Sequence, residues 1–183
     1  YINSTLKVDY QKTSNDNYLK IFDVKSPILP VSNDVLETII KLDLEHENYD
    51  LTTSIERYET LKGRNSDRYQ YVLPTFNFNK NLYLKNLKGG LNFNSYGNNT
   101  LKDTNITTST LFNDLSYSSL NKFLENGIKT NFNIFLKNVN TSGKNNPKYE
   151  ESPQSELMSA YTYNVSLPMV KKTNTNFNTL EPK

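Results

Sequence analysis

The residues able to carry chemistry are few in this chain and stand apart from one another. There is one histidine, His46, placed between Glu45 and Glu47, and cysteine is absent. A zinc site or a Ser/His/Asp triad needs that histidine together with ligands or partners at a defined spacing, and no such pattern flanks it. We therefore expect no metal site, no cofactor and no enzymatic activity. His46 is assigned a structural or solvated role at a strand end.

The paired carboxylates are equally weak evidence for catalysis. Asp43 and Glu45 are two positions apart, which puts both on one face of a strand, and Glu150 and Glu151 are adjacent in a polar stretch. A glycosidase dyad needs two carboxyl groups facing each other across a substrate. The simpler interpretation is that Asp43 and Glu45 lie on the water-facing side of a strand and that Glu150 and Glu151 lie at the tip of a loop.

Composition excludes further functions. The 21 Lys and Arg residues nearly balance the 19 Asp and Glu residues, so a net charge of +2 with interspersed signs does not suit nucleic acid. The mean hydropathy is -0.71, and the chain has no uninterrupted apolar stretch of the roughly 18 residues that a membrane-spanning helix requires. Because the chain begins at Tyr1 without a signal segment, we expect it to be a fragment of a longer protein.

The elements that must position these residues are strands. Aliphatic or aromatic side chains occupy every second position within 6–10 and 40–45, and all but Thr130 of the alternate positions within 128–137. Period two gives each segment one apolar and one polar face. The 35% hydrophobic content is low for two sheets that fill a core between them, and the 12% aromatic content argues against disorder. A barrel with lipid outside and water inside fits, because it needs no protein core.

We predict an all-β fold, an antiparallel up-and-down meander of about nine strands, with residues 1–183 forming a single segment of a large transmembrane outer-membrane β-barrel. The predicted strands are 2–11, 17–24, 35–47, 50–58, 69–78, 82–95, 105–117, 127–139 and 156–167. Short turns are predicted at 13–16, 48–49 and 79–81 with a longer one at 118–126, and long loops at 25–34, 59–68, 96–104 and 140–155. Outer-membrane barrels have this asymmetry, with the long loops outside the cell.

Three local features refine this prediction. Pro74 interrupts a good strand pattern and predicts a bulge or weakened pairing, because proline has no amide hydrogen. Gly89-Gly90 lies inside a predicted strand and marks a bend or bulge, and helix is plausible only in short pieces, such as 119–125. Tyrosines gather near predicted strand ends, as the aromatic girdles of membrane barrels do; they are Tyr10, Tyr18, Tyr49, Tyr58, Tyr69, Tyr83, Tyr96 and Tyr117.

The alternation also assigns the two faces. The residues expected to point to lipid are Leu42, Leu44, Ile134, Leu136, Tyr163 and Val165. The residues expected to line a polar lumen are Lys41, Asp43, Glu45, Glu56, Asn92, Asn94, Lys129, Asn131, Asn133 and Lys137. A slip of one residue in any strand would reverse its part of both sets.

Several segments resemble the LptD family of outer-membrane lipopolysaccharide-assembly proteins. In that family a strand ending in an aromatic-rich run leads through a polar loop into a strand of the Arg-Tyr-x-x-(Leu)-Pro type, which is similar to 55–61 followed by Arg68-Tyr69 and Leu73-Pro74 here. The other similar segments are 10–18 running on to 21–23, 167–168 and 180–183. The resemblance covers most of the chain.

The resemblance implies a non-enzymatic translocon in the outer membrane of a Gram-negative bacterium. Family members receive lipopolysaccharide from a periplasmic bridge, pass it through a β-jellyroll and a barrel lumen that holds the plug lipoprotein LptE, and release it into the outer leaflet. The implied partners are therefore lipopolysaccharide, an LptE-like plug, the periplasmic bridge and outer-membrane lipid. The chain departs from the family in lacking the jellyroll, the first strands with their gate-weakening prolines, the closing strand and the cysteines, so the lateral gate is not assigned here and Pro74 is not taken for it.

Two other interpretations share part of this evidence. Another outer-membrane barrel, such as a porin or a receptor, has every physical feature described above. A soluble β-sandwich or adhesin-like binding module is a different class, and a requirement for detergent separates that class from the barrels.

Overall fold

The computed structural model describes the chain except residues 1–2, 22–33, 65–66, 86–87, 173–176 and 181–183. The described residues form a 9-stranded sheet and a separate two-stranded hairpin. The sheet strands are β1 (Asn3–Asp9), β2 (Val35–His46), β3 (Tyr49–Thr60), β4 (Tyr69–Leu82), β5 (Gly89–Lys102), β6 (Ile106–Ser119), β7 (Lys122–Phe123), β8 (Lys129–Lys144) and β9 (Gln154–Ser166). The remaining elements are the short helix α1 (Tyr18–Ile21) and the hairpin β10 (Met169–Lys172) and β11 (Phe177–Leu180).

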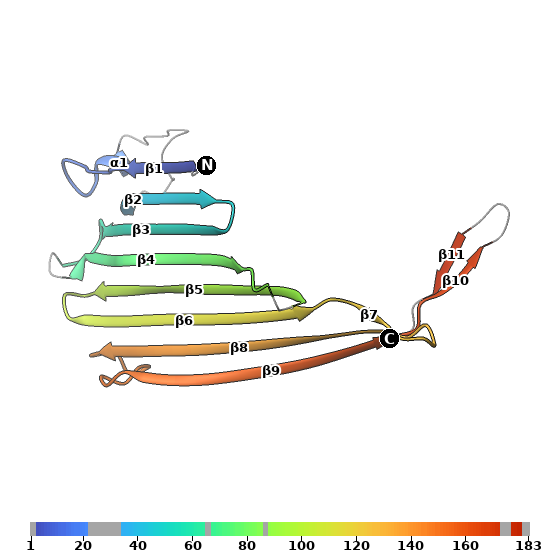
Figure 1. The fold of residues 1–183 in the computed structure, drawn as a ribbon. Helices are drawn as coiled ribbons and strands as arrows, with labels where there is room; N and C mark the ends of the chain where they lie inside the picture. The colour runs from blue at the N-terminus through green and yellow to red at the C-terminus, as the bar shows by residue number, and fades with distance from the viewer. Residues whose placement is uncertain (1–2, 22–33, 65–66, 86–87, 173–176, 181–183) are drawn as a thin grey trace.

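The sheet is a meander in which each long strand pairs antiparallel with the next. The order is β1-β2-β3-β4-β5-β6-β8, with β9 beside β8 and the two residues of β7 continuing the β6 side of β8. Figure 1 shows these strands side by side in one layer, with the β10–β11 hairpin standing away from it. The predicted all-β antiparallel meander is confirmed.

This single layer has almost no protein core. The only buried hydrophobic side chains in the described part of the chain are Leu36, Leu61 and Val72. Extensive contacts there join neighbouring strands alone, so no second layer covers either face. An apolar strand face that no protein covers must meet another apolar phase or be exposed to water.

Proline produces the predicted irregularity. On both sides of β4 the register shifts, because Leu73 and Pro74 together lie opposite the single residue Ile55 of β3 and the single residue Asn99 of β5. This is a bulge with two residues against one. The prediction of a bulge at Pro74 is confirmed, whereas Gly89-Gly90 begins β5 and does not interrupt a strand.

The predicted strand 17–24 is wrong over its described part. Residues Tyr18–Ile21 form α1, and residues 22–24 lie outside the described residues, as does most of the predicted loop 25–34. The Asn15 side chain accepts a hydrogen bond of 3.0 Å from the backbone of Asn17, and the Asn17 carbonyl accepts from Ile21 at 2.9 Å. Asparagine stabilises such turns locally, which outweighs the weak alternation of the segment.

Two connections predicted from asparagine-rich stretches are strand. The predicted turn 79–81 belongs to β4, and most of the predicted loop 96–104 belongs to β5, leaving a tight turn at 103–105. The connection from β4 to β5 instead occupies 83–88, and Tyr96 lies well inside a strand. Consequently the predicted alternation of long and short connections fails at 103–105.

The two remaining connections also differ in extent from the prediction. Strand β8 continues to Lys144 and β9 begins at Gln154, so the predicted loop 140–155 shortens to 145–153. The predicted turn 118–126 contains β7, and the helix predicted at 119–125 is wrong. The backbone of β7 pairs with the first residues of β8, so the segment prolongs the sheet.

Candidate functional site

The register of the sheet sorts its side chains onto two faces. Residues opposite each other in an antiparallel pair share a face, and neighbours along a strand alternate. Leu42 is paired with Leu6 and Thr53, and Lys41 with Lys7 and Ser54. We call the face that carries Leu42 face A and the face that carries Lys41 face B.

Both predicted sets of residues separate completely when the pairing is followed across the sheet. Face A carries Leu42, Leu44, Ile134, Leu136, Tyr163 and Val165. Face B carries Lys41, Asp43, Glu45, Glu56, Asn92, Asn94, Lys129, Asn131, Asn133 and Lys137. The two sets therefore lie on opposite sides of one sheet, and which phase each side meets stays a prediction.

Face A presents an uncovered apolar band that crosses every long strand. Its exposed members include Leu6 at 66%, Ile40 at 47% and Tyr161 at 65%. Rings from neighbouring strands pack within it, with centroids 5.5 Å apart for Tyr117 and Phe132. The band consists of Leu6, Val8, Ile40, Leu42, Leu44, Leu51, Ile55, Phe76, Phe78, Leu91, Phe93, Leu115, Tyr117, Phe132, Ile134, Leu136, Tyr161, Tyr163 and Val165.

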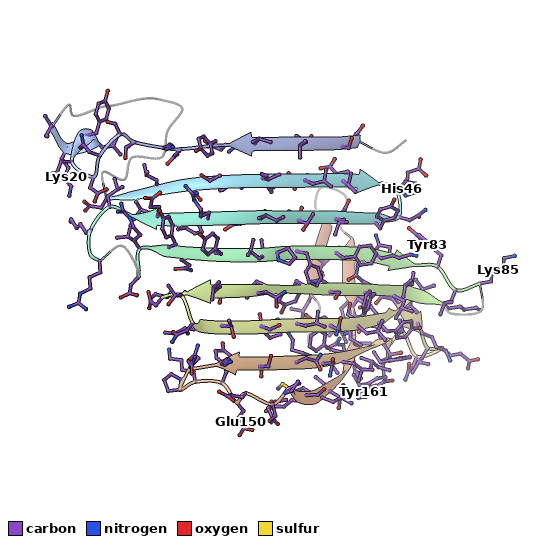
Figure 2. All side chains as sticks on the ribbon, turned by 90° about the vertical axis from the view of Figure 1, so that its left-hand side faces the viewer. Lys20, His46, Tyr83, Lys85, Glu150 and Tyr161 are labelled. Carbon is purple, nitrogen blue, oxygen red and sulfur yellow. The ribbon has the colours of Figure 1, made fainter. Side chains whose placement is uncertain are left out.

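The apolar band runs obliquely to the rows of paired residues. One row is apolar at its β2 end and polar at its β9 end, and it reads Leu42, Thr53, Phe76, Gly97, Leu111, Asn140 and Ser155. A second row is polar at its β2 end and apolar over β5, β6 and β8, and it reads His46, Tyr49, Lys80, Phe93, Leu115, Leu136 and Ser159. Figure 2 accordingly shows Tyr161 of β9 towards the end of the sheet where His46 lies.

The slope of the band across the rows gives the tilt of the strands, which is the angle between a strand and the direction perpendicular to the long axis of the band. The centre of the band is Leu42 on β2 and Ile134 on β8. The residue of β8 in the same row as Leu42 is Asn140, so the centre of the band moves along the strand from position 140 to 134 over the five strand-to-strand steps from β2 to β8. With about 3.3 Å per residue and about 4.8 Å between strands, this shift corresponds to a tilt of roughly 40°. Strands of membrane barrels tilt by about 35–45°.

Face B carries a cationic centre that spans three strands. The Lys137 ammonium donates to the Tyr96 hydroxyl at 3.0 Å and pairs with the Asp114 carboxylate at 3.2 Å. The Tyr96 and Phe112 rings stack with centroids 4.9 Å apart, and the ammonium lies 5.5 Å from the Tyr96 centroid and 5.8 Å from that of Phe135. Lys137 was among the predicted lumen residues, but its aromatic and acidic partners were missed, because they come from other strands.

The rest of face B is a network of side-chain hydrogen bonds. Asp43 accepts from Thr52 at 2.8 Å and pairs with Lys41 at 2.9 Å. Glu56 accepts from Ser54 at 2.6 Å and from Tyr58 at 2.7 Å. The amide of Asn92 donates to Asn79 at 2.9 Å and to Asn81 at 3.0 Å, and the amide of Asn164 donates to Asn131 at 2.8 Å. Such a surface suits contact with water.

Ion pairs tie α1 to the sheet at the end where the loops 61–68 and 145–153 lie. The Asp34 carboxylate pairs with Lys20 at 2.8 Å and with Lys62 at 2.7 Å. Hydrogen bonds from Lys20 and Lys62 hold the pKa of Asp34 below its ordinary value. Arg68 pairs with Asp16 at 2.7 Å. Figure 2 shows Lys20 and Glu150 at this end, which we call the loop end, and His46, Tyr83 and Lys85 at the other, the turn end.

Comparison with known proteins gives the family. The model of the LptD family, described as LPS transport system D, matches residues 3–183. The chain belongs to the LptD family. No curated protein matches it. The family is a transport family, so the function of the chain is related to lipopolysaccharide transport, and the resemblance noted in the sequence is confirmed.

Two further observations concern other kinds of site. No helix in the described part of the chain is long and apolar enough to cross a membrane. Across the described ranges, His, Asp and Glu side chains form no group of three or more that could hold a metal ion.

Proposed function

We propose that residues 1–183 form one segment of the wall of a transmembrane β-barrel in the outer membrane of a Gram-negative cell. The barrel carries lipopolysaccharide to the outer leaflet. Membership of the LptD family supports the cargo, and the oblique apolar band on an uncovered face carries the assignment to a barrel wall. A β-sandwich would need a second sheet packed against this face, and the described residues do not provide one.

In this proposal face A meets lipid and face B lines the lumen. Lipid offers no hydrogen-bonding partners, and face A presents Leu, Ile and Phe where the band crosses each strand. Face B presents charges of both signs, amides and hydroxyls, which give a sugar-rich and phosphorylated head group a hydrated route. An LptE-like plug occupies the lumen, and a periplasmic bridge delivers the cargo; both are proposed as partners on the strength of the family.

Cysteine labelling tests the facing. Residues 1–183 contain no cysteine, so a cysteine substituted for Asn133, Ile134 or Leu136 is the only thiol of this segment, and any cysteine elsewhere in the protein is replaced by serine for the test. In native membranes a water-soluble maleimide should react at position 133 and not at 134 or 136. Reaction at 134 and 136 with protection at 133 would reverse the two faces, and equal reaction at all three positions would disprove the barrel wall.

Orientation and cargo need separate measurements. Epitope tags in the loop 145–153 should be reached by antibody on intact cells, whereas tags at 47–48 should be reached only after permeabilisation. Depletion of the protein should stop pulse-labelled lipopolysaccharide from reaching the cell surface while other outer-membrane barrels still assemble. Normal arrival of the label would exclude the transport function and leave a porin or a receptor.

A further inference from the structure

Face A does not stay apolar up to the loop end of the sheet. On β5, β6 and β8 the apolar band gives way to a polar area, which we call the polar belt. Its polar members are Ser95, Asn99, Ser109, Asn113, Asn138, Asn140, Ser142 and Lys144, and they surround one leucine of β6, Leu111. If face A meets lipid, as proposed above, the polar belt stands beyond the hydrocarbon on the outside of the barrel.

The polar belt is taller than a phospholipid head-group layer. It runs on β8 from Asn138 to Lys144, which at about 3.3 Å per residue and a tilt of roughly 40° reaches roughly 15 Å above the band. The polar layer of an ordinary bilayer adds only roughly 5–7 Å on each side. The upper part of the belt therefore lies at the depth of a larger, sugar-bearing head group.

Hydrogen bonds hold the lower part of the polar belt in place. Asn113 accepts from Ser95 at 2.8 Å and donates to Asn138 at 3.3 Å. Asn138 also accepts from Asn140 at 2.5 Å and donates to Ser155 at 3.1 Å. These hydrogen bonds connect four strands and use the polar groups of the two amides, so they hold the side chains of the lower belt in fixed positions.

The upper part of the belt is hollowed into a groove of about 310 Å³. Its side-chain walls come from three adjacent strands, with Leu73 of the β4 bulge on one side and Glu151 of the loop 145–153 on the other. The face A residues that line it are Asn99, Leu101, Thr107, Ser109, Ser142 and Lys144, and the face B residues Thr100, Thr108 and Gly143 of the same strands also border it. Small side chains on β6 and β8 leave the space open.

The groove offers hydrogen-bond donors without partners. Asn99 accepts from Ser109 at 2.6 Å, which fixes its amide oxygen and leaves the amide nitrogen available. Within the described part of the chain, the Thr107 and Ser142 hydroxyls and the Lys144 ammonium make no hydrogen bond or ion pair. Lys144 is exposed. Glu151 adds a carboxylate that can only accept hydrogen bonds, so the groove carries one charge of each sign. Such a donor-rich groove with one cation suits an anionic saccharide, whose phosphate or carboxylate oxygens accept and whose hydroxyls reach Glu151.

We propose that this groove binds the phosphorylated saccharide of lipopolysaccharide lying in the outer leaflet, against the outside of the barrel wall. Lys144 contacts the anionic group, and Asn99 and Ser142 contact sugar oxygens. The site is distinct from the lumen surface on face B. This inference rests on the proposed function, because it needs face A in lipid and the loop end outside the cell.

Photo-crosslinking in intact cells tests the groove. A photoreactive residue replaces Ser142, which faces the groove, or its neighbour Thr141, which lies on face B. Position 142 should crosslink to lipopolysaccharide even after new synthesis is stopped, because the outer leaflet stays filled. Lys144→Gln should lower the yield at 142 by about two- to fivefold, the range for one exposed ionic contact. The matched control Lys148→Gln, in the loop outside the groove, should leave the yield unchanged.

The outcomes separate the two proposals. No crosslink at 142, or a yield unaffected by Lys144→Gln, while the thiol at 134 is protected by lipid, overturns the groove and leaves the barrel wall standing. A thiol at 134 that reacts from water defeats the barrel wall itself. In detergent, the purified natural protein should prefer phosphorylated over dephosphorylated lipopolysaccharide more strongly than Lys144→Gln does, and an equal preference in the two proteins would overturn the role of Lys144. Binding of the delipidated oligosaccharide alone at equal strength would overturn the assignment to a membrane lipid.

Discussion

At the scale of single residues, Lys137 is the cationic centre of face B, where its ammonium contacts Asp114 of β6 and Tyr96 of β5. Period two placed Lys137 and Asn133 on the same face as Lys41 because alternation within a strand needs no knowledge of its neighbours. The partners of Lys137 could not be found in this way. Asp114 on β6 and Tyr96 on β5 contact Lys137. These contacts depend on the register between strands, which the pattern within one strand does not determine.

The Lys137–Asp114 pair gives a prediction at this scale. Lys137→Gln should destabilise the folded protein by about 1 kcal/mol, because the Asp114 carboxylate then loses its cationic partner. Urea unfolding in detergent or lipid measures the loss. The matched control Lys102→Gln, at an exposed strand end, should cost less than about 0.5 kcal/mol.

A double-mutant cycle checks that the pair is the cause. Asp114→Asn combined with Lys137→Gln should recover part of the loss, since neither charge is then left alone. Strictly additive losses would mean that Lys137 acts through its ring contacts and not through Asp114.

At the scale of elements, most strands could be predicted and several turns could not. The apolar alternation of β2, β3 and β8 is strong, and those strands lie where it indicated. Asparagine misled the prediction at 79–81 and 96–104 because in isolation it favours turns. In this sheet it forms cross-strand amide pairs, such as Asn92 with Asn79 at 2.9 Å, and Asn98 accepts from Thr110 at 3.2 Å.

The β4 bulge gives a prediction at this scale. Deleting Pro74 removes the extra residue, so Leu73 would pair with Ile55 and Asn99 and lie on face A. Tyr71 and Phe76 would keep their present face, and we expect the deletion to be tolerated. Deleting Asn77 instead leaves the bulge and moves every β4 residue on one side of the deletion to the opposite face.

Heat modifiability on gels measures this outcome. The Pro74 deletion should give a folded, heat-modifiable band near the natural level, and the Asn77 deletion should lose most of it. Equal loss in both variants would mean that the bulge itself is required, and equal tolerance would mean that facing in β4 does not matter.

At the scale of the whole molecule, a single sheet with one uncovered apolar face poses an energetic problem. In the described residues β1 and β9 each pair on one side only, so each has an edge of backbone N–H and C=O groups. In lipid, each unsatisfied backbone group costs several kcal/mol. Closure into the proposed barrel would remove the edges and give face A a suitable phase, so we expect the sheet to be stable only as part of a larger closed structure.

Residues 1–183 expressed alone should therefore not form a soluble monomer. The edges template strand pairing between copies, and the apolar band on face A, with Leu6 66% and Tyr161 65% exposed, drives association in water. We expect the isolated chain to sediment without detergent and to remain in solution with it. Ultracentrifugation and urea unfolding measure this directly. The matched control replaces Leu42, Leu44, Ile134 and Leu136 with serine, which should reduce association if face A drives it and leave association unchanged if the edges do. A detergent-free monomer of the natural sequence that unfolds cooperatively would contradict the barrel wall, because such a chain would have covered face A by itself.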